Sequence, residues 1–133
     1  MLDCNNKIAF IHIPKTGGIS VNTLFNWSKH HDPSHRRSSI KASEIAHYLK
    51  IKHNEDFENY YSFAIIRNPY DRMVSFYHFQ KKKYKFEHSF EEYLKIIEQC
   101  QKDKKQRKQL SNKLSITDIS DVLTPMSYYI CLL

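Results

Sequence analysis

The only two glycines of this 133-residue chain stand side by side, at Gly17 and Gly18. An apolar run over residues 7–13 precedes them and is typical of a buried strand. Apolar residues at helical spacing follow them, at Val21, Leu24 and Phe25. A glycine pair provides backbone with positive φ, or room for a close approach. The sequence therefore predicts a strand, a tight loop and a helix in direct succession.

Lys15 lies in the same loop, one residue before Thr16 and the glycines. A loop of this kind gathers backbone N–H groups, a helix N-terminus and one ammonium group around a point, which suits a phosphate-like anion. The alternative is a plain strand-to-helix turn that happens to use two glycines. A Walker-type ATP loop is disfavoured, because its lysine follows the last glycine, whereas Lys15 precedes both.

A second strand and helix are predicted further along the chain. Residues 62–67 are almost continuously apolar, as in a central parallel strand. Asn68 and Pro69 suit the N-cap and first position of a helix, which apolar residues extend to about Gln80 at Tyr70, Met73, Val74 and Tyr77. Two successive strand–turn–helix units predict an α/β fold with a parallel sheet.

Weaker patterns predict the remaining elements. A short helix is expected around Ile45, Tyr48 and Leu49, followed by irregular backbone over residues 50–60. Ser89 and Glu92 form a capping box, which opens a helix whose expected buried stripe is Phe90, Tyr93, Leu94 and Ile97. Thr124 and Pro125 are expected to start a last helix. The lysine-rich runs at 81–83 and 102–108 are expected to be exposed.

Composition limits the partners without choosing one. The net charge of +7 and the pI of about 9.3 favour anions such as nucleotides, nucleic acid, acidic glycans or a membrane surface. Three distant cysteines without a C-x-x-C pair predict neither a disulfide framework nor that type of zinc site. No apolar run is long enough to span a bilayer. A single domain over 1–133 is expected, and the abrupt apolar end at 130–133 favours a chain that lacks its C-terminal part.

A second anion site is predicted at Arg67. This residue lies at the carboxyl end of the second strand, where open α/β sheets bind their ligands. Its planar guanidinium suits phosphate, and Ser75 lies two turns into the next helix. The alternative is that Arg67 pairs with Asp71 or another carboxylate. Two such sites at neighbouring strand ends indicate one ligand with two separated anionic groups.

The two motifs, IPKTGGIS at 13–20 and IRNPYDRMVSFY at 66–77, together resemble the sulfotransferase family. The match looks closest to the carbohydrate branch, including the heparan sulfate 2-O-sulfotransferase type. It covers residues 7–77 well, with a weaker echo at 123–129. The resemblance implies a P-loop-like, three-layer α/β domain with a central parallel sheet flanked by helices.

The same resemblance implies a donor, 3′-phosphoadenosine 5′-phosphosulfate (PAPS), with PAP as product and no metal. The phosphosulfate would lie among Lys15, Thr16, Gly17, Gly18, Ile19 and Ser20, and the 3′-phosphate would bind Arg67 and Ser75. Ile19 departs from the commoner Thr or Ser. A lysine can stabilise charge on the leaving oxygen, which makes Lys15 a catalytic candidate.

The acceptor hydroxyl needs a general base. His35 stands at a place comparable to the histidine of the 2-O-sulfotransferases, with His30 and His31 as competitors and a solvated side chain as the alternative role. His12 is expected to be structural. The implied acceptor is a carbohydrate or another hydroxyl compound. The basic loop at 30–37 would suit an acidic acceptor. The oligomeric state is left open.

Other functions remain in view at this stage. A truncated relative could bind PAP or a polyanion without turnover. A nucleic-acid-binding protein lacks support, since no helix-turn-helix, zinc-finger or RRM signature is present. A nucleotide kinase lacks its Walker sequence. The chain is expected in the cytoplasm if its N-terminus is complete, and in the Golgi lumen if it is a fragment of a longer eukaryotic-type protein.

Overall fold

The computed structural model describes residues 1–26, 40–102 and 122–130. The chain divides into two compact units. Unit 1 comprises Met1–Ile66 and Pro125–Leu133, and unit 2 comprises Arg67–Thr124. Each unit has a buried core of its own. In the described residues unit 1 contains the sheet, whereas unit 2 is helical.

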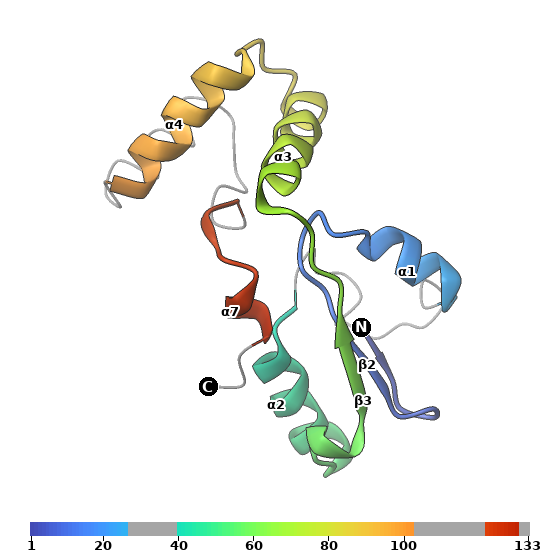
Figure 1. Ribbon diagram of the computed structural model, residues 1–133. Helices are drawn as coiled ribbons and strands as arrows, with labels where there is room; N and C mark the ends of the chain where they lie inside the picture. Colours follow the sequence, from blue (N-terminus) through green and yellow to red (C-terminus); the bar gives the residue numbers. More distant parts are fainter. Residues whose placement is uncertain (27–39, 103–121, 131–133) are drawn as a thin grey trace. The chain divides into compact units, whose positions relative to one another are not determined.

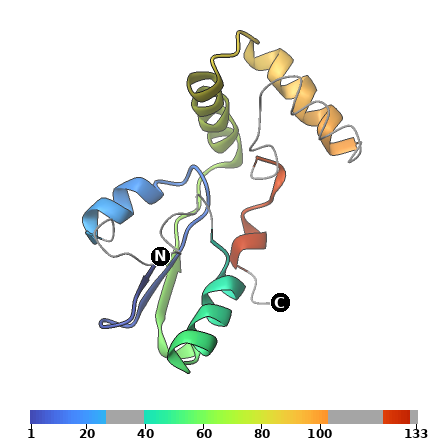
Figure 2. The ribbon, with the colours of Figure 1, turned by 180° about the vertical axis from the view of Figure 1, so that it is seen from behind.

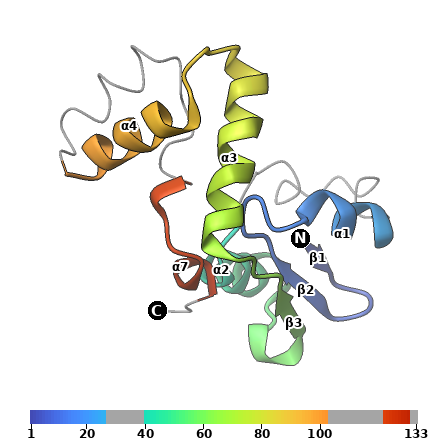
Figure 3. The ribbon, with the colours of Figure 1, turned by 45° about the horizontal axis from the view of Figure 1, so that its top comes forward.

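The sheet of unit 1 has three strands in the order β1 (Leu2–Asp3), β2 (Ile8–Ile11) and β3 (Tyr61–Ala64) (Figure 3). β2 and β3 are parallel, which confirms the predicted pairing of the two apolar runs. β1 is antiparallel to β2, because the four residues between them allow only a hairpin. The described sheet is therefore mixed, and β3 occupies its edge rather than the expected central position.

Two helices belong with this sheet, α1 (Gly18–Leu24) and α2 (Ala42–His53). Because side chains alternate across a strand, β2 supplies two separate cores. Ala9 and Ile11 pack with the buried residues of α2, whereas Phe10 packs with Val21 of α1. The two helices accordingly lie on opposite sides of the strands (Figure 1).

Both helices differ in length or burial from the sequence expectation. α1 stops at Leu24, whose side chain is 80% exposed, so Val21 is the apolar residue of this helix that reaches the core. α2 continues through His53, and the 3-10 helix η3 (Phe57–Asn59) follows, where irregular backbone was expected. Asn54 ends α2 at a φ of 52°, a left-handed conformation that asparagine tolerates well.

The last helix of unit 1 is α7 (Ser127–Ile130). It begins after Pro125, which was wrongly expected as its first residue. The Pro125 carbonyl instead accepts a turn hydrogen bond from the Tyr128 N–H at 3.1 Å. Tyr129 is buried in the same core as α2, and Lys41 Nζ donates to Tyr128 Oη at 2.7 Å. These contacts attach the C-terminal segment to the start of α2.

Unit 2 contains α3 (Pro69–Tyr84) and α4 (Phe90–Lys102), joined by a short connection (Figure 2). Both predicted helix starts are confirmed. Asn68 Oδ1 accepts from the Tyr70 N–H at 2.9 Å, and Ser89 and Glu92 bond reciprocally at 2.7 and 3.3 Å. α3 runs four residues beyond Gln80, and Lys85 ends it at a φ of 54°.

The helices of unit 2 bury a different stripe from the one predicted. Tyr93 and Ile97 are buried as expected, but Leu94, Val74 and Tyr70 are exposed. Gln80 takes part in the core, because its Oε1 accepts from Tyr93 Oη at 2.7 Å. Simple apolar spacing missed this stripe, since it includes polar residues that find partners inside. Within the described ranges, no helix is long and apolar enough to cross a membrane.

Candidate functional site

The loop between β2 and α1 has two residues with positive φ. Lys15 has a φ of 68° and Gly17 a φ of 95°. For a residue with a Cβ such as Lys15, this conformation costs about 1 kcal/mol, and strain of this kind persists at sites where the surroundings enforce it. A Cβ added at Gly17 would meet no heavy atom within 4 Å. Backbone conformation, and not space, therefore favours glycine at position 17.

Thr16 holds the loop together from inside. Its side chain is buried, and Thr16 Oγ1 donates to the carbonyl oxygen of Ile13 at 2.8 Å. The hydroxyl hydrogen is thus committed to the loop itself. In this geometry Thr16 does not offer its hydroxyl hydrogen to a bound anion.

Gly18 is required for a different reason from Gly17. A Cβ at Gly18 would lie 1.9 Å from Nε2 of His12 and 2.2 Å from its Cδ2. The His12 ring also stacks on Phe10, with centroids 5.9 Å apart and an interplanar angle of 29°. These contacts agree with the structural role expected for His12.

The N-terminus of α1 has no capping side chain. Gly17 is the N-cap and provides no capping side chain, so the first-turn N–H groups are not capped from that position. Ser20 is exposed, and Ile19 is 84% exposed, so only its backbone can serve a site in the loop. Unit 1 thus brings one set of predicted residues together: Lys15, Thr16, Gly17, Gly18, Ile19 and Ser20.

The second motif offers its side chains and little of its backbone. Pro69 has no N–H, and the Tyr70 N–H is already bonded to Asn68. The backbone at Pro69 and Tyr70 therefore leaves no N–H donor for an anion. Arg67 is exposed between β3 and α3, and Ser75 is half-buried on α3. An anion at this motif would depend on those two side chains.

The other arginine of the motif, Arg72, is structural. It is buried, and its Nη1 donates to the carbonyl oxygen of Thr124 at 3.1 Å. Its guanidinium carbon also lies 5.0 Å from the centre of the Phe76 ring. The sequence provided no role for this residue, because its partner is 52 positions away.

Lys15 belongs to unit 1, and Arg67 and Ser75 belong to unit 2. The strands that precede the two motifs both belong to unit 1 and pair in parallel. Ile11 of β2 lies opposite Ala64 of β3, so both strands leave the sheet at the same edge. This is the edge at which open α/β sheets bind ligands.

The three candidate bases, His30, His31 and His35, lie outside the described residues. The segment that carries them returns to the structure at Ile40. The Ile40 N–H donates to the carbonyl oxygen of His12 at 3.1 Å. The described chain therefore resumes beside the residue that packs on the loop.

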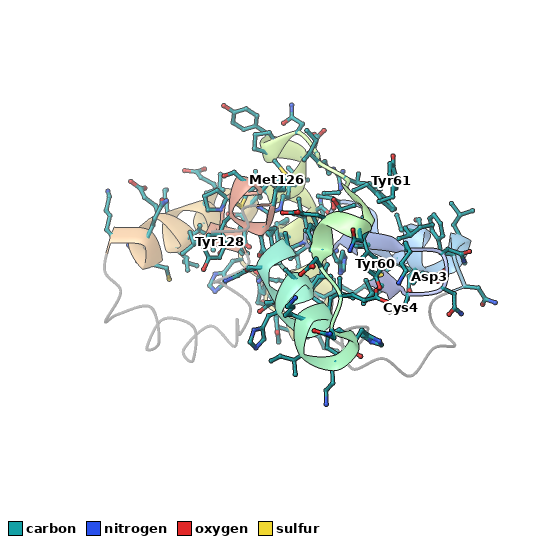
Figure 4. The ribbon with its side chains drawn as sticks, turned by 90° about the horizontal axis from the view of Figure 1, so that it is seen from below. Asp3, Cys4, Tyr60, Tyr61, Met126 and Tyr128 are labelled. Atoms are coloured by element: carbon teal, nitrogen blue, oxygen red, sulfur yellow. The ribbon has the colours of Figure 1, made fainter. Side chains whose placement is uncertain are left out.

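A charged cluster at the other end of β2 was not predicted from the sequence. Lys7 Nζ lies 2.5 Å from Glu55 Oε1, and Tyr60 Oη donates to the other oxygen of the same carboxyl. The bonds from Lys7, and next from Tyr60, lower the pKa of Glu55. Burial is the main cause that raises the pKa of Tyr60, which also contacts Cys4 (Figure 4). Because Lys7 precedes β2 and the loop follows it, this cluster lies at the opposite end of β2 from the loop.

No group of three metal-ligating side chains occurs in the part of the chain that the structure describes. The model of the sulfotransferase family matches residues 1–130. The chain belongs to the sulfotransferase family. No curated protein and no solved structure matches it significantly.

Membership of the sulfotransferase family supports sulfuryl transfer as the general activity of this chain. It also agrees with a hydroxyl-bearing acceptor, without specifying its kind. The described fold of this sulfotransferase, a small three-stranded sheet with helices, is a mixed α/β arrangement consistent with the family.

Proposed function

We propose that this sulfotransferase uses PAPS as its donor and sulfates a carbohydrate hydroxyl. The β2–α1 loop carries the proposal, since positive φ at Lys15 and Gly17, an uncapped helix end and a lysine occur together in it. That donor set fits an anionic phosphosulfate group. The exposed Gly17, with open space around it, would let such a group approach the backbone closely.

The 3′-phosphate of the donor is assigned to Arg67 and Ser75. The guanidinium can bind two phosphate oxygens in a fork, and the serine hydroxyl can donate one further hydrogen bond. The capped N-terminus of α3 supports a site made from side chains. Because Ile11 and Ala64 are paired, the two motifs follow strands that end at the same edge.

PAPS supplies an activated sulfuryl group, whose bond to the bridging phosphate oxygen breaks as a new bond forms to the acceptor oxygen. The role of Lys15 is to stabilise the negative charge that develops on the bridging oxygen. His35 is the proposed base that takes the hydroxyl proton, with His30 and His31 as alternatives.

The acceptor is proposed to be an acidic polysaccharide of the heparan type, after the branch that the two motifs resemble. The net charge of +7 supports this choice, since a basic protein attracts polyanions. A binding module that holds PAP without turnover is the competing function. The two functions differ in whether sulfate is transferred to an acceptor.

The test is transfer of labelled sulfate from PAPS to N-sulfated, O-desulfated heparan polysaccharide, alongside PAP affinity. Lys15→Ala should lower the transfer rate by about 10²- to 10³-fold and weaken PAP binding far less. Alanine keeps the Cβ, so the backbone cost at the φ of 68° is unchanged. Lys52→Ala, which removes an exposed lysine from α2 in the same unit, is the matched control. Transfer that survives Lys15→Ala would overturn the role of Lys15, and PAP binding without any transfer by the wild type would favour the binding module.

A further inference from the structure

The His12 imidazole fills the space into which a side chain at position 18 would extend. All three nearest atoms to a Cβ at position 18 belong to this ring, with Nε2 at 1.9 Å, Cδ2 at 2.2 Å and Cε1 at 2.8 Å. Distances below 3.0 Å force something to move. The ring therefore rests directly on the backbone of the first residue of α1.

The histidine is held from two directions. Its ring stacks on Phe10, which is fully buried in the core that also contains Val21 of α1. Its carbonyl oxygen accepts the hydrogen bond from Ile40 at 3.1 Å. The stacking on Phe10 opposes movement of the ring, and the hydrogen bond from Ile40 holds the backbone that carries it. His12 thus connects the sheet core with the first turn of α1.

Gly17 provides the contrast within the same loop. Its φ of 95° disfavours any side chain, yet nothing lies within 4 Å of a Cβ placed there. A substitution at position 17 is costly through backbone conformation, whereas one at position 18 is costly through the His12 ring. The two neighbouring glycines are therefore separable by experiment.

We propose that His12 is a positioning residue for donor binding, whose ring sets the first turn of α1 and the preceding loop in the anion-binding conformation. This inference rests on the proposed function, because the loop is the proposed phosphosulfate site. His12 acts through Gly18 and is not assigned any contact with the donor. The ring occupies the place that a side chain at position 18 would take. The effects of substitutions at positions 12 and 18 on PAP affinity should therefore depend on each other.

The test is a set of PAP titrations by calorimetry on the full chain, with thermal unfolding measured for each variant. Gly18→Ala should weaken PAP binding by about tenfold or more, since overpacking of this size displaces the loop. Adding His12→Ala to Gly18→Ala makes room for the new methyl group and should restore most of the lost affinity. His12→Ala alone should weaken binding while the chain remains folded, because the first turn of α1 loses its support.

Gly17→Ala is the matched control. It should also weaken PAP binding, but His12→Ala should not rescue it, because no clash is present at that position. Equal PAP affinity of Gly18→Ala and the wild type would overturn the inference. So would a folded double variant that binds no better than Gly18→Ala, or rescue of both glycine variants alike. If Gly18→Ala fails to fold, the comparison of His12→Ala with the wild type decides, and unchanged PAP affinity contradicts the inference. A wild-type chain that does not bind PAP would reject the proposed function and the inference together.

Discussion

Lys15 and Gly17 both have positive φ, although only one of them is a glycine. The difference makes sense if position 15 needs a side chain that glycine lacks. Lys7 and Lys85 also have positive φ, so the backbone conformation alone does not assign a role to Lys15. At the residue scale, what distinguishes Lys15 is its place in the loop directly before Thr16 and the two glycines.

Glu55 leads to a prediction about pH. Lys7 and Tyr60 stabilise its ionised form and lower its pKa in the folded protein. Its contribution to stability is therefore present above the ordinary carboxyl value of 4.5, and it is lost as pH falls through the lower folded value. The melting temperature of Glu55→Gln should lie below that of the wild type near neutral pH, and the gap should close in acid.

Thermal unfolding monitored by circular dichroism between about pH 3 and pH 7 measures this gap. A gap of the same size at both ends of the range would show that the carboxylate charge is not what stabilises the cluster.

Helix ends separate the two motifs at the scale of elements. α1 begins at a glycine without a capping side chain, whereas α3 begins at Asn68 and Pro69, which leave few free donors. One helix end thus lacks a side-chain cap, and the other is capped by Asn68. The first motif can bind through its backbone, and the second depends on Arg67 and Ser75.

The start of α4 provides a test of the capping box. Ser89→Ala removes the acceptor of the Glu92 N–H and should lower the free energy of unfolding by about 1 kcal/mol. Ser89→Asn keeps a capping oxygen and should change stability by only a few tenths of that amount. Urea unfolding of the three proteins measures the difference. Equal stability of the alanine and asparagine variants would argue against a side-chain cap.

Local patterns identified the starts of α3 and α4 and the two parallel strands, because caps and apolar runs act over a few residues. They failed where the burial of a residue depends on a partner that is distant in the sequence. Gln80 and Arg72 are polar, yet they are buried against Tyr93 and the Thr124 carbonyl. The clash that explains Gly18 also depends on how the His12 ring lies, which no spacing rule contains.

At the scale of the whole molecule, a net charge of +7 could attract any polyanion. The proposed PAP site requires more than this general attraction. It requires a specific guanidinium for the 3′-phosphate. Arg67→Ala and Lys82→Ala remove the same charge from unit 2. Lys82 lies near the other end of α3, about 20 Å along the helix from its start. The pair therefore distinguishes a local contact from overall charge.

The most direct measurement is a calorimetric titration of the folded chain with PAP, repeated with these two variants. We predict a single site in the wild type and in Lys82→Ala, and affinity at least about tenfold weaker in Arg67→Ala, as expected for a lost charge-assisted contact. A folded wild-type chain that does not bind PAP, or an Arg67→Ala variant that binds it as tightly as the wild type, would contradict the account.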